Sequence, residues 1–549
     1  MASPTTFHRT KKSNPKMVSF FPTFSTALLF LLTLSAVALL LLHSPSLSPC
    51  GGSNSSSAAP ASSNRAFFGD LRQVDFSWNS LRLSTDRPPP TTLRIAVFSR
   101  KWPIATAPGG MERHALTLHS ALARRGHQVH VFTSAPPSAE RPPEGGAGST
   151  SPRLHFLSGP QWRCDEAWAL YEAEEAAAGP FDVVHSESVA VFHRWARNVP
   201  NLVVSWHGIS LEALHSGIYQ DLARGAANEP MTPAFNRSLS ESIYKVLNEI
   251  RFFQNYAHHV AISDSTGEML RDVYQIPSGR VHVILNGIEE DKFAPDTRLG
   301  EAFRSEIGVP KGTAPLVMGI AGRLVKDKGH PLLYEAFSKL VLRHPNVYLV
   351  VAGTGPWAQR YADLGTNVVV LGAVPPAKLK AFYNALDVFV NPTLRPQGLD
   401  LTLMEAMQCG KPVVATRFPS IKGTIVVDDE FGYTFAPNVE ALLEVLEKVV
   451  AEGKARLAQR GRACKEYAKS MFTAAKMAAA YERLFLCIKN ETYCSRIGAS
   501  GRGGRAGLSG CGGRIRVSDR GDQAGKNGYG GRTGASDRRS QVGVDDCEG

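Results

Sequence analysis

A regular alternation of apolar runs and helical segments is the feature that most constrains how this chain can fold. The run at residues 94–98 has the composition of a buried strand, residues 111–125 carry apolar side chains at helical spacing, and residues 128–133 are strand-like again. This order predicts a parallel sheet covered by helices, which is an α/β fold. Further strand-like runs are at residues 181–185, 202–206, 260–262, 281–285, 316–321, 347–352, 368–371, 388–390 and 413–415.

The length of the chain predicts more than one such domain. The chain has 549 residues, and 43% of them are hydrophobic, which is typical of a globular protein with a full core. We expect a first domain at residues 93–295 and a second at 312–470, joined by a linker around residues 295–313. Residues 209–240 are expected to form a loop, and a helix at 471–488 is expected to cross back to the first domain.

The formal net charge of +12 is compatible with binding to nucleic acid or to a membrane surface. Much of the excess lies at the two ends, because basic residues precede position 20 and the C-terminal stretch is rich in Arg and Gly. The composition therefore favours a near-neutral body with basic tails and no nucleic-acid partner. Residues 495–549 are predicted to be a disordered tail.

Residues 20–42 are uncharged and apolar, and they are long enough to span a bilayer. We expect an uncleaved transmembrane anchor, with a signal peptide as the alternative. The basic segment 1–19 then stays cytosolic, and the rest of the chain is lumenal. Residues 43–92 are predicted to be a flexible stem rich in Ser, Pro and Gly. The expectation is a single-pass type II glycoprotein of the Golgi, with sequons at Asn54, Asn236 and Asn490.

The eight cysteines are scattered, and they form no CxxC pair that would suggest zinc or redox chemistry. Cys487 and Cys494 are the only close pair that spacing alone makes plausible as a disulfide.

The Gly109-Gly110 pair and His207 of the first domain suggest a ligand site. Gly109 and Gly110 lie at a strand-to-helix turn, where backbone can approach a ligand and the helix N-terminus favours an anion. A tight turn is the structural alternative, and the pattern lacks the GxGxxG fingerprint of a nicotinamide cofactor site. His207 follows a predicted strand, at the edge where open α/β sheets bind ligands. A hydrogen-bonded loop histidine is its alternative.

The second domain has a glycine turn with basic neighbours. Arg323 and Lys328 stand at the head of a predicted helix, where the guanidinium fork and the ammonium can clamp a diphosphate. A solvated pair of loop charges is the alternative. Gly353 and Gly355 form another glycine turn at a strand end.

The stretch at residues 397–416 combines a turn, a short helix and an apolar strand. Gln397 and Gly398 form the turn, and Glu405 lies within an otherwise apolar helix. Because a buried carboxylate without a partner is costly, Glu405 is expected to face a polar cleft or a hydrogen-bonding ligand. A glutamate on the helix surface is the alternative.

Taken together, these motifs resemble glycosyltransferase family 4, whose members are retaining enzymes of GT-B fold. The resemblance covers most of the span from Leu93 to about Ile488, and it suggests a plant-like type II membrane member. It rests on the order and spacing of six pieces, which are Gly109-Gly110 with Glu112 and His114, the strand end at His207-Gly208, the turn at Asn286-Gly287, Gly322-Arg323 with Lys328-Gly329, Gly353-Thr354-Gly355, and the block that ends at Glu405.

The resemblance implies two facing Rossmann-like domains, with a nucleotide-sugar donor held mainly by the second. Arg323 and Lys328 match the residues that bind the diphosphate without a metal ion. Glu405 matches the second glutamate of the E-x7-E motif, which accepts hydrogen bonds from the ribose. His207 matches a histidine near the reacting centre. The implied donor-binding residues are Gly109, Gly110, Arg323, Lys328, Gly353, Gly355, Gly398, Leu399 and Glu405.

The sequence departs from the motif at its first glutamate, which is Gln397 here. An amide can hydrogen-bond to a sugar, but it cannot act as a carboxylate nucleophile or base. Front-face transfer, in which the departing phosphate oxygen takes the proton of the acceptor, is therefore the fitting mechanism. Asp400 is a candidate replacement carboxylate, and the expected catalytic residues are His207, Gln397 and Asp400.

The resemblance implies a hexosyl- or pentosyltransferase that uses a UDP- or GDP-linked sugar, with no cofactor and no metal. Its acceptor is a glycan, a lipid or a small molecule. The alternatives are a nucleotide-sugar-binding pseudoenzyme without catalysis, and a GT-B nucleotide-sugar epimerase or phosphorylase.

Overall fold

The computed structural model describes residues 71–85, 87–104, 109–136, 150–226, 229–310, 312, 314–396 and 398–495. The predicted anchor at residues 20–42, the predicted tail beyond Ser495, and Gln397 lie outside these residues. Among the described helices, none is both long and apolar enough to cross a bilayer.

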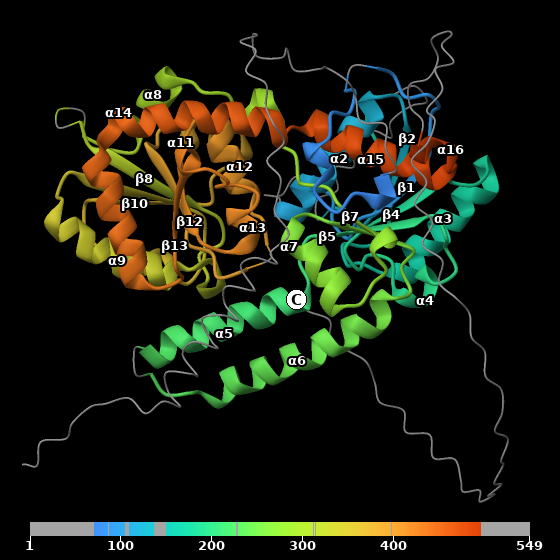
Figure 1. Cartoon of the computed structure of the whole chain (residues 1–549), viewed down its shortest axis with the longest axis horizontal. Helices are drawn as coiled ribbons and strands as arrows, with labels where there is room; N and C mark the ends of the chain where they lie inside the picture. The colour runs from blue at the N-terminus through green and yellow to red at the C-terminus, as the bar shows by residue number, and fades with distance from the viewer. Residues whose placement is uncertain are drawn as a thin grey trace, which may run out of the picture. The chain divides into compact units, whose positions relative to one another are not determined.

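The first domain contains a parallel sheet of seven strands in the order β3-β2-β1-β4-β5-β6-β7. Figure 1 shows this domain with β1, β2, β4, β5 and β7 labelled. Both faces of this sheet are buried, since Ile95 and Val97 of β1 contribute to one apolar cluster and Ala96 and Phe98 to another. This two-sided burial explains the continuous apolar runs of the sequence. The strands are β1 Arg94–Phe98, β2 Gln128–Thr133, β3 Arg153–Phe156, β4 Val183–Glu187, β5 Leu202–Trp206, β6 His258–Ala261 and β7 Val281–Val283.

Helices and short helical turns connect the strands of this domain. Most of these connections are crossovers, because a hairpin cannot join two parallel strands. The helical segments are η1 Leu71–Gln73, η2 Trp78–Ser80, α2 Gly110–Arg124, α3 Cys164–Ala178, α4 His193–Ala196, α5 Ser210–Ala226, α6 Pro233–Phe253, α7 Asp264–Glu268, η3 Met269–Val273, η4 Ser278–Arg280 and η5 Glu290–Phe293.

The second domain contains a parallel sheet of six strands in the order β10-β9-β8-β11-β12-β13. Its strands are β8 Leu316–Ala321, β9 Val347–Ala352, β10 Val368–Gly372, β11 Val388–Asn391, β12 Val413–Thr416 and β13 Gly432–Phe435. Its helical segments are α8 Thr297–Glu306, η6 Lys326–Lys328, α9 His330–Arg343, α10 Ala358–Ala362, α11 Pro376–Asn384, α12 Leu401–Gln408, α13 Pro419–Lys422, η7 Asp429–Phe431 and α14 Val439–Met471.

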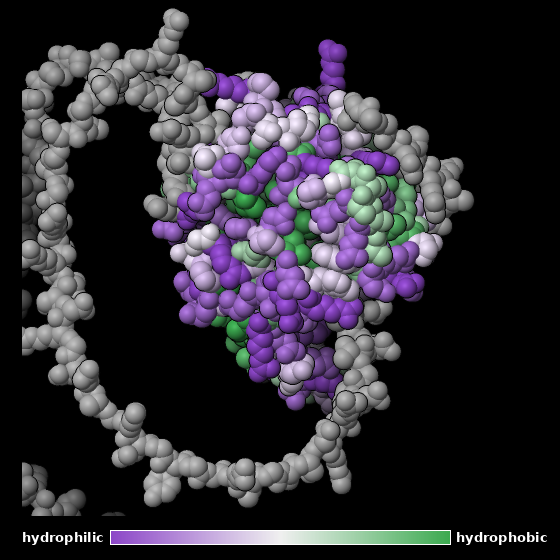
Figure 2. Space-filling view, turned by 90° about the vertical axis from the view of Figure 1, so that its right-hand side faces the viewer, coloured by the Kyte–Doolittle hydropathy of each residue, from purple (hydrophilic) through white to green (hydrophobic). Residues whose placement is uncertain are grey.

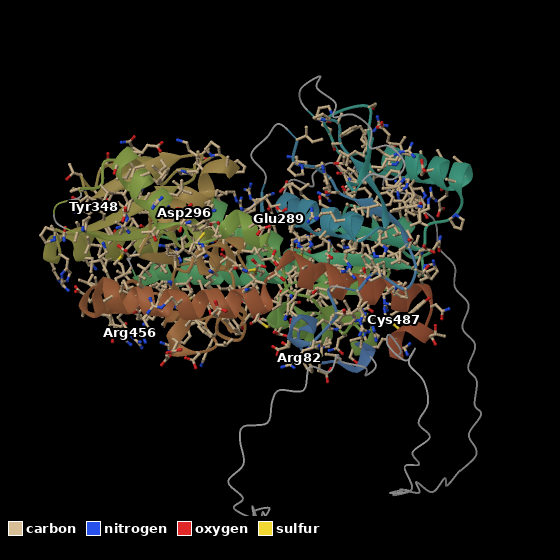
Figure 3. All side chains as sticks on the ribbon, turned by 90° about the horizontal axis from the view of Figure 1, so that it is seen from above. Arg82, Glu289, Asp296, Tyr348, Arg456 and Cys487 are labelled. Carbon is tan, nitrogen blue, oxygen red and sulfur yellow. A yellow bond between two sulfur atoms is a disulfide. The ribbon has the colours of Figure 1, made fainter. Side chains whose placement is uncertain are left out.

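The C-terminal helices connect the two domains. Helix α14 packs against α9 and α12 of the second domain, and α15 (Ala474–Lys489) packs against α2 of the first (Figure 1). Tyr481 and Leu484 of α15 share an apolar cluster with Ile95. A disulfide joins Cys487, labelled in Figure 3, to Cys494 in α16 (Thr492–Ser495). The suggested pairing of these two cysteines is confirmed.

Two stretches predicted to be irregular are helical. The predicted loop at 209–240 contains α5 and the first turns of α6, which pack side by side (Figure 1). The predicted linker contains α8, which Asp296 caps and whose Phe303 is buried. Polar residues interrupt the apolar pattern of α5 and α8, and packing against neighbouring helices decides their structure instead.

The C-terminal part of the predicted stem is packed rather than flexible. Leu71 and Trp78 are fully buried, and they belong to the same apolar cluster as Ile95. Asn79 also donates to the backbone carbonyl of Met471 at 3.0 Å. A tryptophan buries a large apolar surface, and the Ser- and Pro-rich surroundings concealed this signal. The strands β3 and β13 and the helix α3 are among the elements that were not predicted.

Hydrophilic residues dominate the face of the molecule shown in Figure 2, and hydrophobic residues form small patches between them. The large apolar side chains instead fill the clusters on the two sheets.

Candidate active site

Several of the predicted site residues lie at the carboxyl ends of parallel strands, where open α/β sheets bind ligands. His207 follows β5, Arg323 follows β8, and Gly353 follows β9. Gly109 and Gly110 begin α2, and both are exposed. The two sheets thus each present one row of strand ends with candidate residues.

His207 is held by a carboxylate that was not among the predicted site residues. Its Nε2 donates to Glu187 Oε2 at 2.6 Å. Glu187 ends β4, the neighbouring strand, and its side chain is fully buried, whereas that of His207 is 11% exposed. The imidazole therefore has a fixed orientation and one edge that reaches the surface.

A chain of hydrogen bonds continues from Glu187 into the protein. His119 Nε2 lies 2.9 Å from Glu187 Oε1 and 3.2 Å from His185 Nδ1. His185 Nε2 then lies 2.8 Å from Ser205 Oγ, which lies 2.7 Å from the hydroxyl of Tyr481. The chain ties the strand ends of the first domain to the crossing helix α15.

Burial and pairing set the charges in this network. Burial lowers the pKa of His114 and of His185 to about 3, so both imidazoles are neutral at pH 7. Burial opposes the charge of Glu187, but the surrounding imidazoles and their hydrogen bonds hold its pKa well below the usual range. The network therefore contains one buried carboxylate, and His119 and His207 are its hydrogen-bond partners.

Acid is expected to destabilise the folded chain through these groups. The unfolded histidines bind protons near pH 6.5, whereas folded His114 and His185 do so only near pH 3. The unfolded state therefore takes up more protons as the pH falls through 6.5, and stability declines. Protonation of each histidine in the unfolded state lowers the free energy of unfolding by about 2 kcal/mol by roughly pH 5. Thermal unfolding should shift to clearly lower temperature between about pH 7.5 and pH 5. An unchanged melting temperature would contradict these pKa directions.

Among the residues that the structure describes, three groups have their potential ligand atoms within 4.8 Å of one another, which is close enough to hold a metal ion. Both ring nitrogens of His114 are buried without a hydrogen-bond partner among the described residues. The expectation that no metal takes part in the reaction stays a prediction. The groups are His114 with Glu187 and His207, His119 with His185 and Glu187, and His130 with His155 and Glu174.

Lys328, predicted to bind the diphosphate, pairs with Asp400. Its Nζ lies 2.5 Å from Asp400 Oδ1, and Asn391 donates to Oδ2 of the same carboxylate at 3.0 Å. Burial alone would raise the pKa of Asp400, but Lys328 and the two hydrogen bonds lower it. Asp400 is therefore ionised, and its carboxylate is directed to Lys328.

The glycine turns after β8 and β9 lie against each other. Gly322 donates to the carbonyl of Ala352 at 2.9 Å, and Leu324 donates to that of Thr354 at 2.8 Å. Gly353 has φ +140°, and a Cβ there would collide with the carbonyl of Gly322. Backbone approach between the turns thus requires glycine at 353. Arg323 lies exposed in the first of these turns.

Glu405 is 2% exposed, and both its oxygens have protein partners. Arg113 of α2 lies 2.5 Å from Oε1, and Tyr383 donates to Oε2 at 2.6 Å. The alternative of an exposed helix-surface glutamate is therefore wrong. Since Arg113 belongs to the first domain, this ion pair joins the two domains behind the candidate site.

Replacing Arg113 with methionine is expected to lower the free energy of unfolding by about 3 kcal/mol, because it leaves the buried Glu405 carboxylate without its cation. Urea unfolding would measure the change. Arg124→Met, at an exposed position of the same helix, is the control and should stay within about 0.5 kcal/mol of the parent. Equal stabilities of the two variants would contradict the importance of this pair.

Four residues of the site were missed, and only one had a sequence signal. Glu187 lies two residues after the predicted strand at 181–185, much as His207 follows the one at 202–206, so the strand-end rule also applies to it. Arg113 contacts Glu405 of the other domain, and Arg395 of the second domain lies 3.4 Å from Glu212 of the first. Local sequence does not reveal such contacts between domains. Gly398 and Leu399 precede α12 as expected, and Leu399 is buried.

Comparison with known proteins agrees with this arrangement. Residues 108–292 match the family model described as Glycosyltransferase Family 4, and residues 305–471 match Glycosyl transferases group 1. A D-inositol 3-phosphate glycosyltransferase of Xylanimonas cellulosilytica is 28% identical over 65% of this chain and 87% of its own length. A GDP-mannose-dependent alpha-(1-6)-phosphatidylinositol monomannoside mannosyltransferase of Mycolicibacterium smegmatis is 31% identical over 35% of this chain and 52% of its own.

Solved structures show the same fold. Sucrose-phosphate synthase of Thermosynechococcus elongatus has a TM-score of 0.56 and 21% identity, over 72% of this chain and 100% of its own. Anabaena HepE, solved with UDP and glucose, has a TM-score of 0.50 and 16% identity, over 72% of this chain and 99% of its own. The predicted pair of Rossmann-like domains in a GT-B fold is confirmed. The chain is a GT-B glycosyltransferase that carries a Glycosyltransferase Family 4 domain and a Glycosyl transferases group 1 domain.

Proposed function

We propose that this glycosyltransferase moves a sugar from a nucleoside-diphosphate sugar to an acceptor with retention of configuration, in the lumen of the secretory pathway. The observation that carries the proposal is the position of Lys328. This lysine lies within a glycine turn at the head of α9, and it is paired with Asp400 directly before α12. A cation at that place can bind a diphosphate.

The proposed mechanism needs no carboxylate nucleophile. Lys328 and Arg323 neutralise the charge that develops on the departing diphosphate. The leaving phosphate oxygen takes the proton of the acceptor hydroxyl on the same face, so the sugar keeps its configuration. His207, whose Nε2 is held by Glu187, uses its other ring nitrogen to contact a sugar hydroxyl beside the bond that breaks. In this scheme the ion pair between Lys328 and Asp400 opens when the donor binds, and Lys328 then contacts the diphosphate.

The relatives suggest which donors to test. One relative is named for dependence on GDP-mannose, and HepE was solved with UDP and glucose. Purified full-length protein should bind at least one UDP- or GDP-linked sugar and release the free nucleotide from it slowly in the absence of acceptor. Absence of binding to every nucleotide sugar of such a panel would contradict the proposal.

A nucleotide-sugar-binding protein without catalysis is the second candidate. Gln397 favours it, because this residue replaces the first glutamate of the E-x7-E motif. Nucleotide-sugar binding without any turnover, with or without added acceptors, would select this candidate over the enzyme.

Three observations support the secretory location. Residues 20–42 have the length and composition of an anchor. The sequon asparagines Asn236 and Asn490 are exposed, and the Cys487–Cys494 disulfide suits an oxidising compartment. In microsomes the body should resist protease until detergent is added, and it should be sensitive to glycosidase. Digestion without detergent would contradict this topology.

A further inference from the structure

The residue Glu212 lies where the two domains meet at the candidate site. It is in the first turn of α5, shortly after His207, and its side chain is only 2% exposed. Helix α5 contacts η6, the turn that contains Lys328. A buried carboxyl group in the first domain thus faces the proposed diphosphate site of the second.

The carboxylate of Glu212 lies between two glycines. A Cβ built on Gly208 would be 3.6 Å from its Oε2, and one built on Gly398 would be 2.7 Å from its Oε1. Gly208 directly follows His207, and Gly398 directly follows Gln397 in the chain. Because Gly398 has no side chain, the Glu212 carboxylate can lie close to the backbone at this position. Position 398 directly follows Gln397, which stands where the family motif has its first glutamate.

The charges around Glu212 leave one carboxylate in excess. Arg395 Nη1 lies 3.4 Å from Glu212 Oε1, but Arg395 also donates to Asp327 at 2.8 Å. Lys328 in turn is paired with Asp400. Two cations therefore face three carboxyl groups, and hydrogen-bond donors from a ligand would stabilise the third. Sugar hydroxyl groups are such donors.

We infer that Glu212 supplies, from the first domain, the carboxylate that binds hydroxyl groups of the donor sugar in place of the glutamate that Gln397 replaces. This inference rests on the proposed function. It predicts that Glu212 acts on the sugar part of the donor, and that free nucleoside diphosphate binds without its help.

The experiment compares Glu212→Gln with the parent in the full-length chain, using GDP, UDP and the nucleotide sugar that the parent turns over. The kcat/KM of the variant should fall about 10- to 100-fold, because a hydrogen bond to a charged group is lost. The Kd for the free nucleotide should stay within about twofold. Adding Gln397→Glu to this variant should raise its kcat/KM by at least about tenfold. Glu241→Gln, an exposed change in the same domain, is the control.

The pH profile of the parent enzyme gives a second readout that needs no variant. Burial raises the pKa of Glu212 to about 7, against the opposing effect of Arg395 and Lys328 and with the support of Asp400 and Asp327. Since kcat/KM reports groups of the free enzyme, it should rise with pH through about 7. Glu212→Gln should remove this rise.

The outcomes separate the two claims. Unchanged kcat/KM in Glu212→Gln, equal weakening of free nucleotide, or a parent profile that is flat between about pH 6 and pH 8 would overturn the role of Glu212 alone. A parent protein that binds no nucleotide sugar would overturn the proposed function, and the role of Glu212 with it.

Discussion

Lys328→Ala lowers kcat/KM for the nucleotide sugar by about 10²- to 10³-fold, which is the effect of removing one preorganised group from a developing charge. The lysine is 20% exposed, and its Nζ lies 2.5 Å from Asp400. Without it the departing diphosphate loses a cation and faces the Asp400 carboxylate instead. Both changes raise the activation barrier for sugar transfer.

Steady-state kinetics with the preferred donor would measure this effect. Lys326→Ala is the matched control, because Lys326 lies exposed in the same turn η6. We expect the control to stay within about threefold of the parent, since solvent screens an exposed charge. Equal activities for the two lysine variants would remove Lys328 from the mechanism.

Glu187→Gln has the second large effect, and it acts on both activity and stability. The substitution removes the charge that accepts hydrogen bonds from His207 at 2.6 Å and from His119 at 2.9 Å. An amide must present its NH₂ group to one of these nitrogens, so the orientation or tautomer of an imidazole changes. We expect kcat to fall about 100-fold and the free energy of unfolding to fall by about 3 kcal/mol.

A buried carboxylate elsewhere in the first domain separates the two effects. Glu482 pairs with His127 at 2.9 Å and with Arg125 at 2.5 Å, beside the amino end of β2 rather than the carboxyl ends that carry the candidate site. Glu482→Gln should lower stability to a similar degree and leave kcat near that of the parent. If both variants lose stability and neither loses kcat, Glu187 has a structural role only.

Much of the fold could be predicted because both sheets are buried on two faces. The residues of β1, β2, β5, β8 and β9 form continuous apolar runs, and their predicted bounds match the structure. Helices α5 and α8 could not be predicted in this way, because contacts with α6 and α11 stabilise their mixed sequences.

The candidate site could be predicted where it depends on strand ends. His207 and Arg323 follow from the rule that ligands bind at the carboxyl ends of parallel strands. Other parts of the site depend on partners from the other domain, such as Arg113 for Glu405 and Glu212 for the turn at Gly398. A local sequence pattern does not predict such contacts between domains.

The most direct test of the account is the anomeric configuration of the sugar released from a nucleotide sugar. Proton NMR would follow the slow hydrolysis of an α-linked UDP- or GDP-sugar by the full-length protein, with water as acceptor, before mutarotation equalises the products. Front-face transfer assisted by Lys328 predicts that the α-anomer appears first, and that Lys328→Ala suppresses its release. First appearance of the β-anomer, or binding without release of any sugar, would contradict a retaining glycosyltransferase.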